Sequence, residues 1–196
     1  SLGYVAGKEE GEIVFDADKA DPKDFVQLIS PLNTVQLLIQ DKEYGKAKII
    51  LEGLAPQAPE FLDIYTQLGK IGMELQDYEC AVFNYRRAYQ IEPASITPEL
   101  YNNLAWLQAT RPSMASRDLD EALRYAELIC YETQFKDAHM LDTLSVVYAA
   151  VGDFQKAIET ARNAWVIASN ENKTMLIQKL NKRLQLFKQS TPYIEE

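Results

Sequence analysis

Apolar and polar positions follow the three-and-four spacing of amphipathic helices along residues 68–93. Leu68 and Ile71 share one face of a first helix, which ends at the polar step from Leu75 to Asp77. A second helix then places five apolar residues on one face: Tyr78, Ala81, Val82, Tyr85 and Ala88. Pro93 ends that helix, because proline lacks the amide hydrogen that a continuing helix requires. The pattern predicts a helical hairpin.

The same pattern occurs one step earlier in the chain, at an offset of 34 residues. Three residue types match at this offset, in the order aromatic, alanine, proline: Tyr44 with Tyr78, Ala47 with Ala81, and Pro59 with Pro93. The alanine has a physical reason, since it lies where the two helices of a hairpin cross most closely and a larger side chain would force their axes apart. A fixed period of this length indicates a repeat array.

Two more hairpins follow in residues 98–132 and 141–168, with Ala122 and Ala157 at the crossings. The first of them carries an insertion, "TRPSMASRD". Pro112 breaks the helix before it, because proline disfavours helical geometry in the preceding residue. Asp118 or Asp120 can cap the helix that restarts. Gly69 and Gly72 are expected where neighbouring helices approach, and Gly152 in a turn.

At this point the chain resembles the tetratricopeptide repeat (TPR) proteins. In the best repeat the resemblance is carried by Tyr65, Leu68, Gly69, Tyr78, Ala81, Tyr85, Ala88 and Pro93. In the last repeat it is carried by Leu141, Leu144, Tyr148, Gly152, Asp153, Phe154, Ala157, Ala161 and Ala164. The end of the chain is similar to the C-terminal TPR region of bacterial TPR proteins, except that Arg111 stands where these often carry a cysteine. The resemblance implies an all-α, right-handed superhelix (α-solenoid) of four hairpins with a C-terminal capping helix.

We expect an acidic, partly ordered leader over residues 1–27 and a repeat array over 28–170, divided at 28–61, 62–95, 98–137 and 138–170. A capping helix over 171–190 and a tail over 191–196 follow. The capping helix has one apolar stripe, Leu176, Leu180, Leu184 and Phe187, which should close the open end of the stack. Its cations are expected on other faces: Lys179, Lys182, Arg183 and Lys188.

The composition of the 196 residues excludes several classes of partner. A formal net charge of −9 and a pI near 4.8 argue against a surface for phosphate backbones, so no nucleic-acid partner is expected. No apolar run approaches the ~18 residues of a membrane span. We expect a cytoplasmic protein, or a periplasmic one if a leader has been removed. The two cysteines, Cys80 and Cys130, lack a second ligand at metal spacing and are expected to pack as small apolar residues.

No catalytic constellation is predicted, and neither is a cofactor or a metal. His139 is the one histidine, beside Asp137 and Asp142, and without a nucleophile at hand it is expected to be solvated. The acidic cluster at residues 18–24 lacks the glycine turn and distal glutamate of a calcium loop. The sequence therefore predicts a protein that is not an enzyme.

In TPR proteins the first helix of each repeat lines the concave face, which implies a peptide-binding groove. Its candidate residues are Asp63, Thr66, Lys70, Met73, Glu99, Asn102, Asn103, Trp106, His139, Asp142 and Val146. Asn103 matches the asparagine of the clamps that grip chaperone tails, but Thr66 stands where their lysine would be. Trp106 is predicted near the middle of the groove as an anchor, whereas Trp165 is expected to pack near the capping helix.

The sequence thus favours a non-enzymatic scaffold that binds a peptide or protein segment in its groove. Two alternatives stay open. The chain could be the docking or regulatory arm of a larger enzyme or assembly, such as a TPR-containing glycosyltransferase. It could also self-assemble as a homo-oligomer, for example a homodimer, through exposed apolar residues of the first repeat, Leu32, Leu37, Leu38 and Ile39. The partner and the pathway are not specified by the residues.

Overall fold

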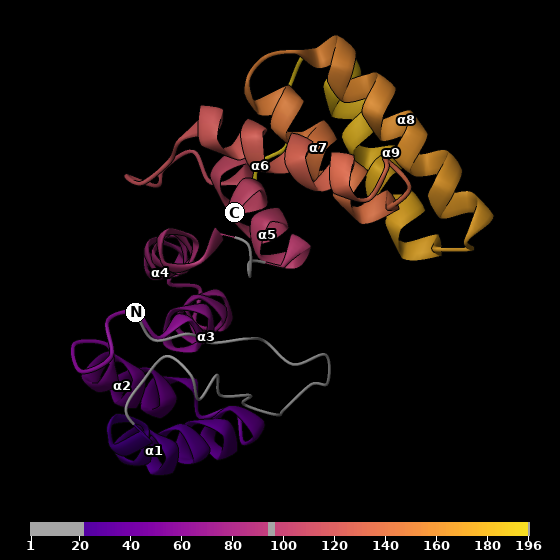
Figure 1. The fold of residues 1–196 in the computed structure, drawn as a ribbon. Coiled ribbons are helices and arrows are strands. Elements are labelled where there is room, and N and C mark those ends of the chain that lie inside the picture. Colours follow the sequence, from indigo (N-terminus) through magenta and orange to yellow (C-terminus); the bar gives the residue numbers. More distant parts are fainter. Residues whose placement is uncertain (1–21, 94–96, 196) are drawn as a thin grey trace. The chain divides into compact units, whose positions relative to one another are not determined.

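The described part of the chain is built from α-helices that follow one another as hairpins (Figure 1). The computed structural model describes residues 22–93 and 97–195, with side chains from residue 27 onward. The helices are α1 Pro22–Gln40, α2 Tyr44–Leu54, α3 Leu62–Glu74, α4 Tyr78–Ile91, α5 Pro98–Thr110, α6 Leu119–Glu132, α7 Ala138–Ala150, α8 Phe154–Asn170 and α9 Thr174–Lys188. They belong to two compact units, residues 1–96 and 97–196, which are treated separately below.

In the first unit each helix packs on the next, α1 on α2, α2 on α3 and α3 on α4. The predicted crossing residues Ala47 and Ala81 are fully buried, as a crossing position requires. The two glycines of α3 are confirmed as points of close approach. A β-carbon on Gly69 would lie 2.2 Å from ring atoms of Tyr85, and one on Gly72 would lie 2.8 Å from the backbone nitrogen of Ala81. Glycine is therefore required at both positions.

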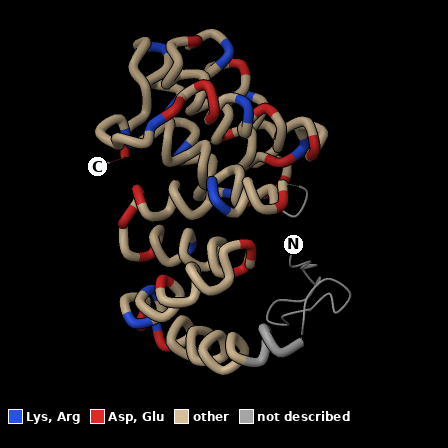
Figure 2. Tube along the Cα trace, turned by 60° about the vertical axis from the view of Figure 1, so that its left-hand side comes forward, with Lys and Arg blue, Asp and Glu red and all other residues tan. Residues whose placement is uncertain are grey.

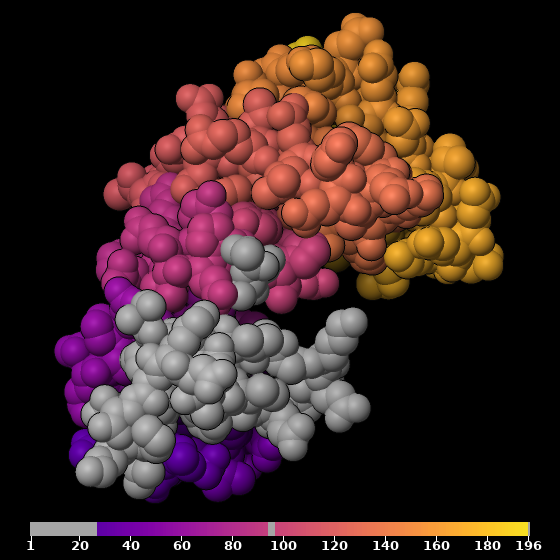
Figure 3. Space-filling model, in the orientation of Figure 1, coloured from indigo at the N-terminus to yellow at the C-terminus, as the bar shows by residue number. Residues whose placement is uncertain are grey.

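The second unit has two layers. Sequential helices pack as pairs from α5 to α9, and α7 also contacts both α5 and α9. The helices α5, α7 and α9 thus form one layer, and α6 and α8 the other. Ala122 and Ala157 are fully buried at the predicted crossings. Figure 3 shows α8 and α9, orange to yellow, as one continuous surface.

Aspartates start several of the helices, as their position before an amphipathic run predicts. The side chains of Asp77, Asp118, Asp137 and Asp153 each accept a hydrogen bond from a backbone amide in the first turn of α4, α6, α7 and α8. Asp118 is therefore the cap after the insertion. Gly152, with a φ of +90°, makes the turn between α7 and α8.

Three expectations need correction. Helix α1 begins at Pro22 and runs through Pro31, so the expected leader boundary at residue 27 falls inside a helix; residues 1–21 lie outside the described residues. Leu32 is fully buried and cannot belong to an exposed oligomerisation patch, although Leu37 is 62% exposed. Trp165, expected to be packed, is 38% exposed on α8.

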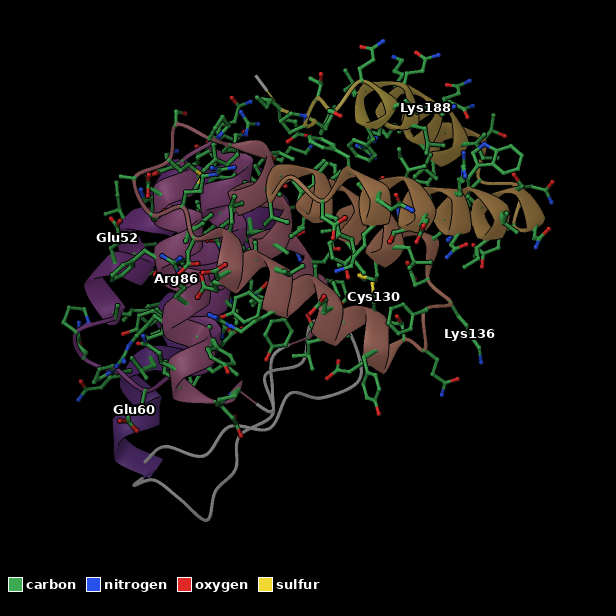
Figure 4. All side chains as sticks on the ribbon, turned by 90° about the horizontal axis from the view of Figure 1, so that it is seen from above. Glu52, Glu60, Arg86, Cys130, Lys136 and Lys188 are labelled. Atoms are coloured by element: carbon green, nitrogen blue, oxygen red, sulfur yellow. The ribbon has the colours of Figure 1, made fainter. Side chains whose placement is uncertain are left out.

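Charged residues occur along the helices of both units. In the described residues, acidic and basic positions are interspersed along the helices (Figure 2). Figure 4 shows Lys136 and Lys188 pointing outward, while Cys130 lies among packed helices and is fully buried. This burial raises the pKa of the Cys130 thiol to about 12. Cys130 is a packing residue, as predicted.

Candidate binding face on the second unit

The centre of the candidate site is Arg183 of α9. It was expected on a solvent-facing side of the capping helix, and the structure contradicts that expectation, since Arg183 is only 4% exposed. The reason is its register. Arg183 lies three residues after Leu180 and four before Phe187, both buried, so it shares their face. Leu184, expected on this stripe, is half-buried.

Arg183 forms an ion pair with Asp142 of α7 that is almost completely removed from water. Their side chains are 4% and 7% exposed, and Arg183 Nη1 donates to Asp142 Oδ2. Burial raises the pKa of the Asp142 carboxyl above its usual value, and the neighbouring Arg183 charge opposes that shift. Asp142 Oδ1 and Arg183 Nε are buried without a hydrogen-bond partner. The pair joins α7 to α9 and fixes the plane of the guanidinium.

Two aromatic rings lie against this guanidinium. The Arg183 carbon Cζ is 4.7 Å from the ring centre of Trp106 on α5 and 4.6 Å from that of Tyr193, which follows α9. The centres of the two rings are 5.8 Å apart. Cation–π contacts of this kind strengthen when the cation is desolvated, as it is here. Trp106 therefore faces the same cluster as Asp142 and Arg183.

The segment 191–195 lies across the end of α5, and Figure 1 shows the C-terminal end of the chain beside that helix. Trp106 Nε1 donates to Glu195 Oε2 at 3.1 Å, and Arg111 Nη2 lies 3.5 Å from the same oxygen. The Glu195 backbone amide donates to the Thr110 carbonyl at 3.1 Å. That carbonyl is one of the last four of a helix, which have no partner within the helix.

Local sequence explains why Arg111 reaches this point. It precedes Pro112, and the residue before a proline is disfavoured in helical geometry. Arg111 accordingly has φ −116° and ψ 78°, and α5 ends at Thr110, as the insertion predicted. Arg111 thus lies at the edge of the cluster and supplies a positive charge to it.

The predicted groove residues of the second unit differ in their exposure. Trp106 and Asp142 meet through Arg183. Asn102 and Asn103 are half-buried, whereas Glu99 and His139 are exposed. Val146 is fully buried and is not accessible to a ligand in this structure. Sequence reasoning missed Arg111, Arg183, Tyr193 and Glu195 as members of the face.

The predicted groove residues of the first unit lie along α3. Asp63 accepts hydrogen bonds from Gln67 and Thr66, and burial raises the pKa of its carboxyl. Met73 is half-buried and Lys70 is exposed. Asp63 is therefore engaged within its own helix, which leaves Lys70 as the accessible charge among these four.

The described residues contain no group of three or more His, Cys, Asp or Glu side chains that could hold a metal ion. Among the described helices, none is long and apolar enough to cross a membrane. His139 is exposed, as expected for a solvated histidine.

Comparisons with known proteins agree with the repeat reading. A family model described as "Tetratricopeptide repeat" matches residues 62–95. The crystal structure of MamA protein is similar to this chain with a TM-score of 0.61 and 14% sequence identity, covering 83% of this chain and 90% of MamA. A search of curated proteins found no match. No enzyme family was detected.

Proposed function

We propose that this chain, which matches a tetratricopeptide repeat at residues 62–95 and has a fold similar to that of a solved repeat protein, is a non-enzymatic scaffold that binds a segment of a partner protein on the layer formed by α5, α7 and α9. TPR repeats generally serve protein interaction, and that general role is the starting point. One observation supports this face in particular. A short segment outside the helices, residues 191–195, lies on it through side-chain and backbone contacts.

The face has the properties of an interaction hot spot. Tryptophan, tyrosine and arginine are the residue types that most often dominate binding energy. Here Trp106 and Arg183 are held rigidly, one by helix α5 and the other by its ion pair with Asp142. A ligand group meeting them loses little free energy to the ordering of flexible side chains.

The two alternatives have less support. If the chain is the docking arm of a larger enzyme, the same face would bind the partner segment. That alternative therefore differs from the proposal only in the enzyme or assembly to which the chain is attached. Self-assembly through the first repeat loses Leu32, which is fully buried. Cytoplasmic localisation stays a prediction.

The proposal is tested by panning a phage-displayed library of random peptides against the full chain and against its Tyr193→Ala variant, in which the segment 191–195 is held less firmly. The affinity of the enriched peptides is then measured for the Trp106→Ala variant. Trp165→Ala is the matched control, because Trp165 lies on α8 outside this layer. Truncation of Trp106 should cost about 2 kcal/mol or more, which is more than tenfold in affinity. An absence of enriched peptides, or equal binding by both tryptophan variants, would refute the proposal.

A further inference from the structure

The contacts of the segment 191–195 indicate what kind of partner the binding face selects. We infer that the face formed by Trp106, Arg111 and Arg183 is selective for an extended segment that carries an aromatic side chain followed two residues later by a carboxylate. The chain's own Tyr193 and Glu195 occupy the face as an intramolecular stand-in, which such a segment displaces. This inference rests on the proposed function and names its partner class.

The aromatic position is set by Arg183. Its guanidinium is buried, and its charge is held in place by Asp142. Two rings contact it: Trp106 on helix α5, and Tyr193, whose ring centre is 4.6 Å from Cζ. When Tyr193 leaves, a flat cation beside the Trp106 ring is uncovered. An aromatic ring covers it best, because the ring combines apolar area with a negatively polarised face.

The acidic position is set by two donors that meet at one point. Trp106 Nε1 and Arg111 Nη2 both approach Glu195 Oε2, at 3.1 and 3.5 Å. An indole N–H and a guanidinium can only donate, so they require an acceptor between them. A carboxylate gives a charge-assisted hydrogen bond to arginine, which is roughly twice as strong as a neutral one.

The spacing between the two positions follows from the backbone. In an extended chain, alternate side chains point to the same side, so residues two apart can reach the same surface. Tyr193 and Glu195 have this spacing and both contact the face, while Ile194 between them is 50% exposed. The Thr110 carbonyl fixes the register by accepting the amide of the acidic residue. The middle residue is therefore free to vary.

Displacement is feasible because the segment contributes little to the core of the unit. Helix α9 is anchored independently by the buried side chains of Leu176, Leu180 and Phe187. Tyr193 and Glu195 are only half-buried, and Thr191 is exposed. The segment is tethered by a few residues to the end of α9 at Lys188, so its effective concentration is on the order of millimolar. An external segment must compete with this tethered segment for the face. Variants that weaken the contacts of Tyr193 and Glu195 should therefore raise the affinity for an external segment.

The test uses a fluorescent peptide with the sequence of residues 188–195, blocked at both ends, and fluorescence anisotropy. The peptide is titrated with the full chain and with a double variant of the full chain that carries Tyr193→Ala and Glu195→Gln. We expect the double variant to bind the peptide at least about tenfold more tightly than the parent. Replacing the peptide's tyrosine by alanine or its glutamate by glutamine should remove most binding, and replacing its isoleucine by serine should not. Adding Arg111→Gln to the double variant should weaken binding of the parent peptide.

Several results would overturn the inference. One is that the peptide does not bind a double variant that keeps the helical circular dichroism of the parent. A second is that the peptide binds the parent and the double variant equally. A third is that replacing the tyrosine or the glutamate of the peptide leaves its binding unchanged. Concentration-dependent dimers of the parent that Tyr193→Ala abolishes would assign the occupant to a second copy instead, which also contradicts it. Panning that enriches Trp106-dependent peptides without the aromatic and acidic pair would sink the inference and leave the proposed function intact.

Discussion

Replacing Arg183 by leucine should destabilise the second unit far more than its place on the last helix suggests. The substitution leaves the Asp142 carboxylate buried without its cation, and breaking a buried pair in this way costs about 3–5 kcal/mol. Both side chains are less than a tenth exposed, at 4% and 7%, so water cannot replace the lost partner. The leucine recovers some free energy by burying apolar surface, about 1.5–3 kcal/mol at most. The substitution also removes the cation–π contacts of Arg183 to Trp106 and Tyr193. The loss of the ion pair and of these contacts together outweighs the gain from burying the leucine.

The pH dependence of this loss separates a buried charge from a simple packing defect. Burial already raises the pKa of Asp142, and Arg183 is the strongest influence that lowers it. Without Arg183 the folded-state pKa rises further above the unfolded value of about 3.9. The variant is then most stable below the unfolded pKa, where Asp142 is protonated in both states, and loses stability as the pH rises through the folded pKa. The deficit relative to the parent should be smaller at about pH 4.5 than at about pH 7.5.

Urea unfolding followed by tryptophan fluorescence measures this directly, because both tryptophans, Trp106 and Trp165, lie in the second unit. Lys182→Leu is the control, since Lys182 is an exposed cation next to Arg183 on the same helix, and it should change stability by less than about 0.5 kcal/mol. Adding Asp142→Leu to Arg183→Leu should restore much of the loss, as replacing both partners of a buried pair often does. A deficit below about 1 kcal/mol, or one that does not change with pH, would refute the reasoning.

Three further predictions concern packing, capping and thiol reactivity. Gly72→Ala should destabilise the first unit, because the new β-carbon would lie 2.8 Å from the backbone of α4. Gly53→Ala is the control: nothing lies within 4 Å of its β-carbon, so it should be neutral or stabilise the unit by up to about 1 kcal/mol. Chemical denaturation followed by circular dichroism measures both. The same sign for both would contradict the close approach. Asp77→Ala should cost about 0.5–2 kcal/mol at neutral pH through loss of the α4 cap. A hydrogen bond from Lys48 holds the pKa of Asp77 below its usual value. The stability deficit of Asp77→Ala should therefore shrink as the pH falls through that pKa, which an acid titration of unfolding measures. Cys80 should react with a thiol reagent in the folded protein, while Cys130, fully buried and with a pKa of about 12, should react only after unfolding; equal rates would be inconsistent with its burial.

Residues that repeat with the fold were predictable from the sequence. Ala47, Ala81, Ala122 and Ala157 are each fully buried at a helix crossing. The backbone geometry of a hairpin recurs in every repeat, so the demand for a small side chain recurs with it and leaves a period in the sequence. The caps are predictable for a related reason, because an aspartate before an amphipathic run acts within three residues of itself.

The binding face was only partly predictable, because its contacts do not repeat. Trp106 was identified from its helix face, but the partners that define its surroundings come from α9 and from the segment after it. Arg183 has the spacing of a core position, yet arginine is rarely fully buried unless it is paired, and the sequence does not show that Asp142 lies opposite. Tyr193 and Glu195 lie in a stretch without helical periodicity, so nothing local indicates what they touch.

The position of α7 affects how the second unit comes apart. In a long repeat array each repeat contacts only its neighbours, so such an array can lose structure gradually from its ends. This unit is short enough that one helix, α7, contacts every other helix in it, α5, α6, α8 and α9, and ten residues of α7 are buried. Local opening is confined to regions with few buried contacts, and α7 has the opposite character. The helices of this unit are thereby bound to one shared element, so its unfolding is a single cooperative event rather than a sequential fraying from one end.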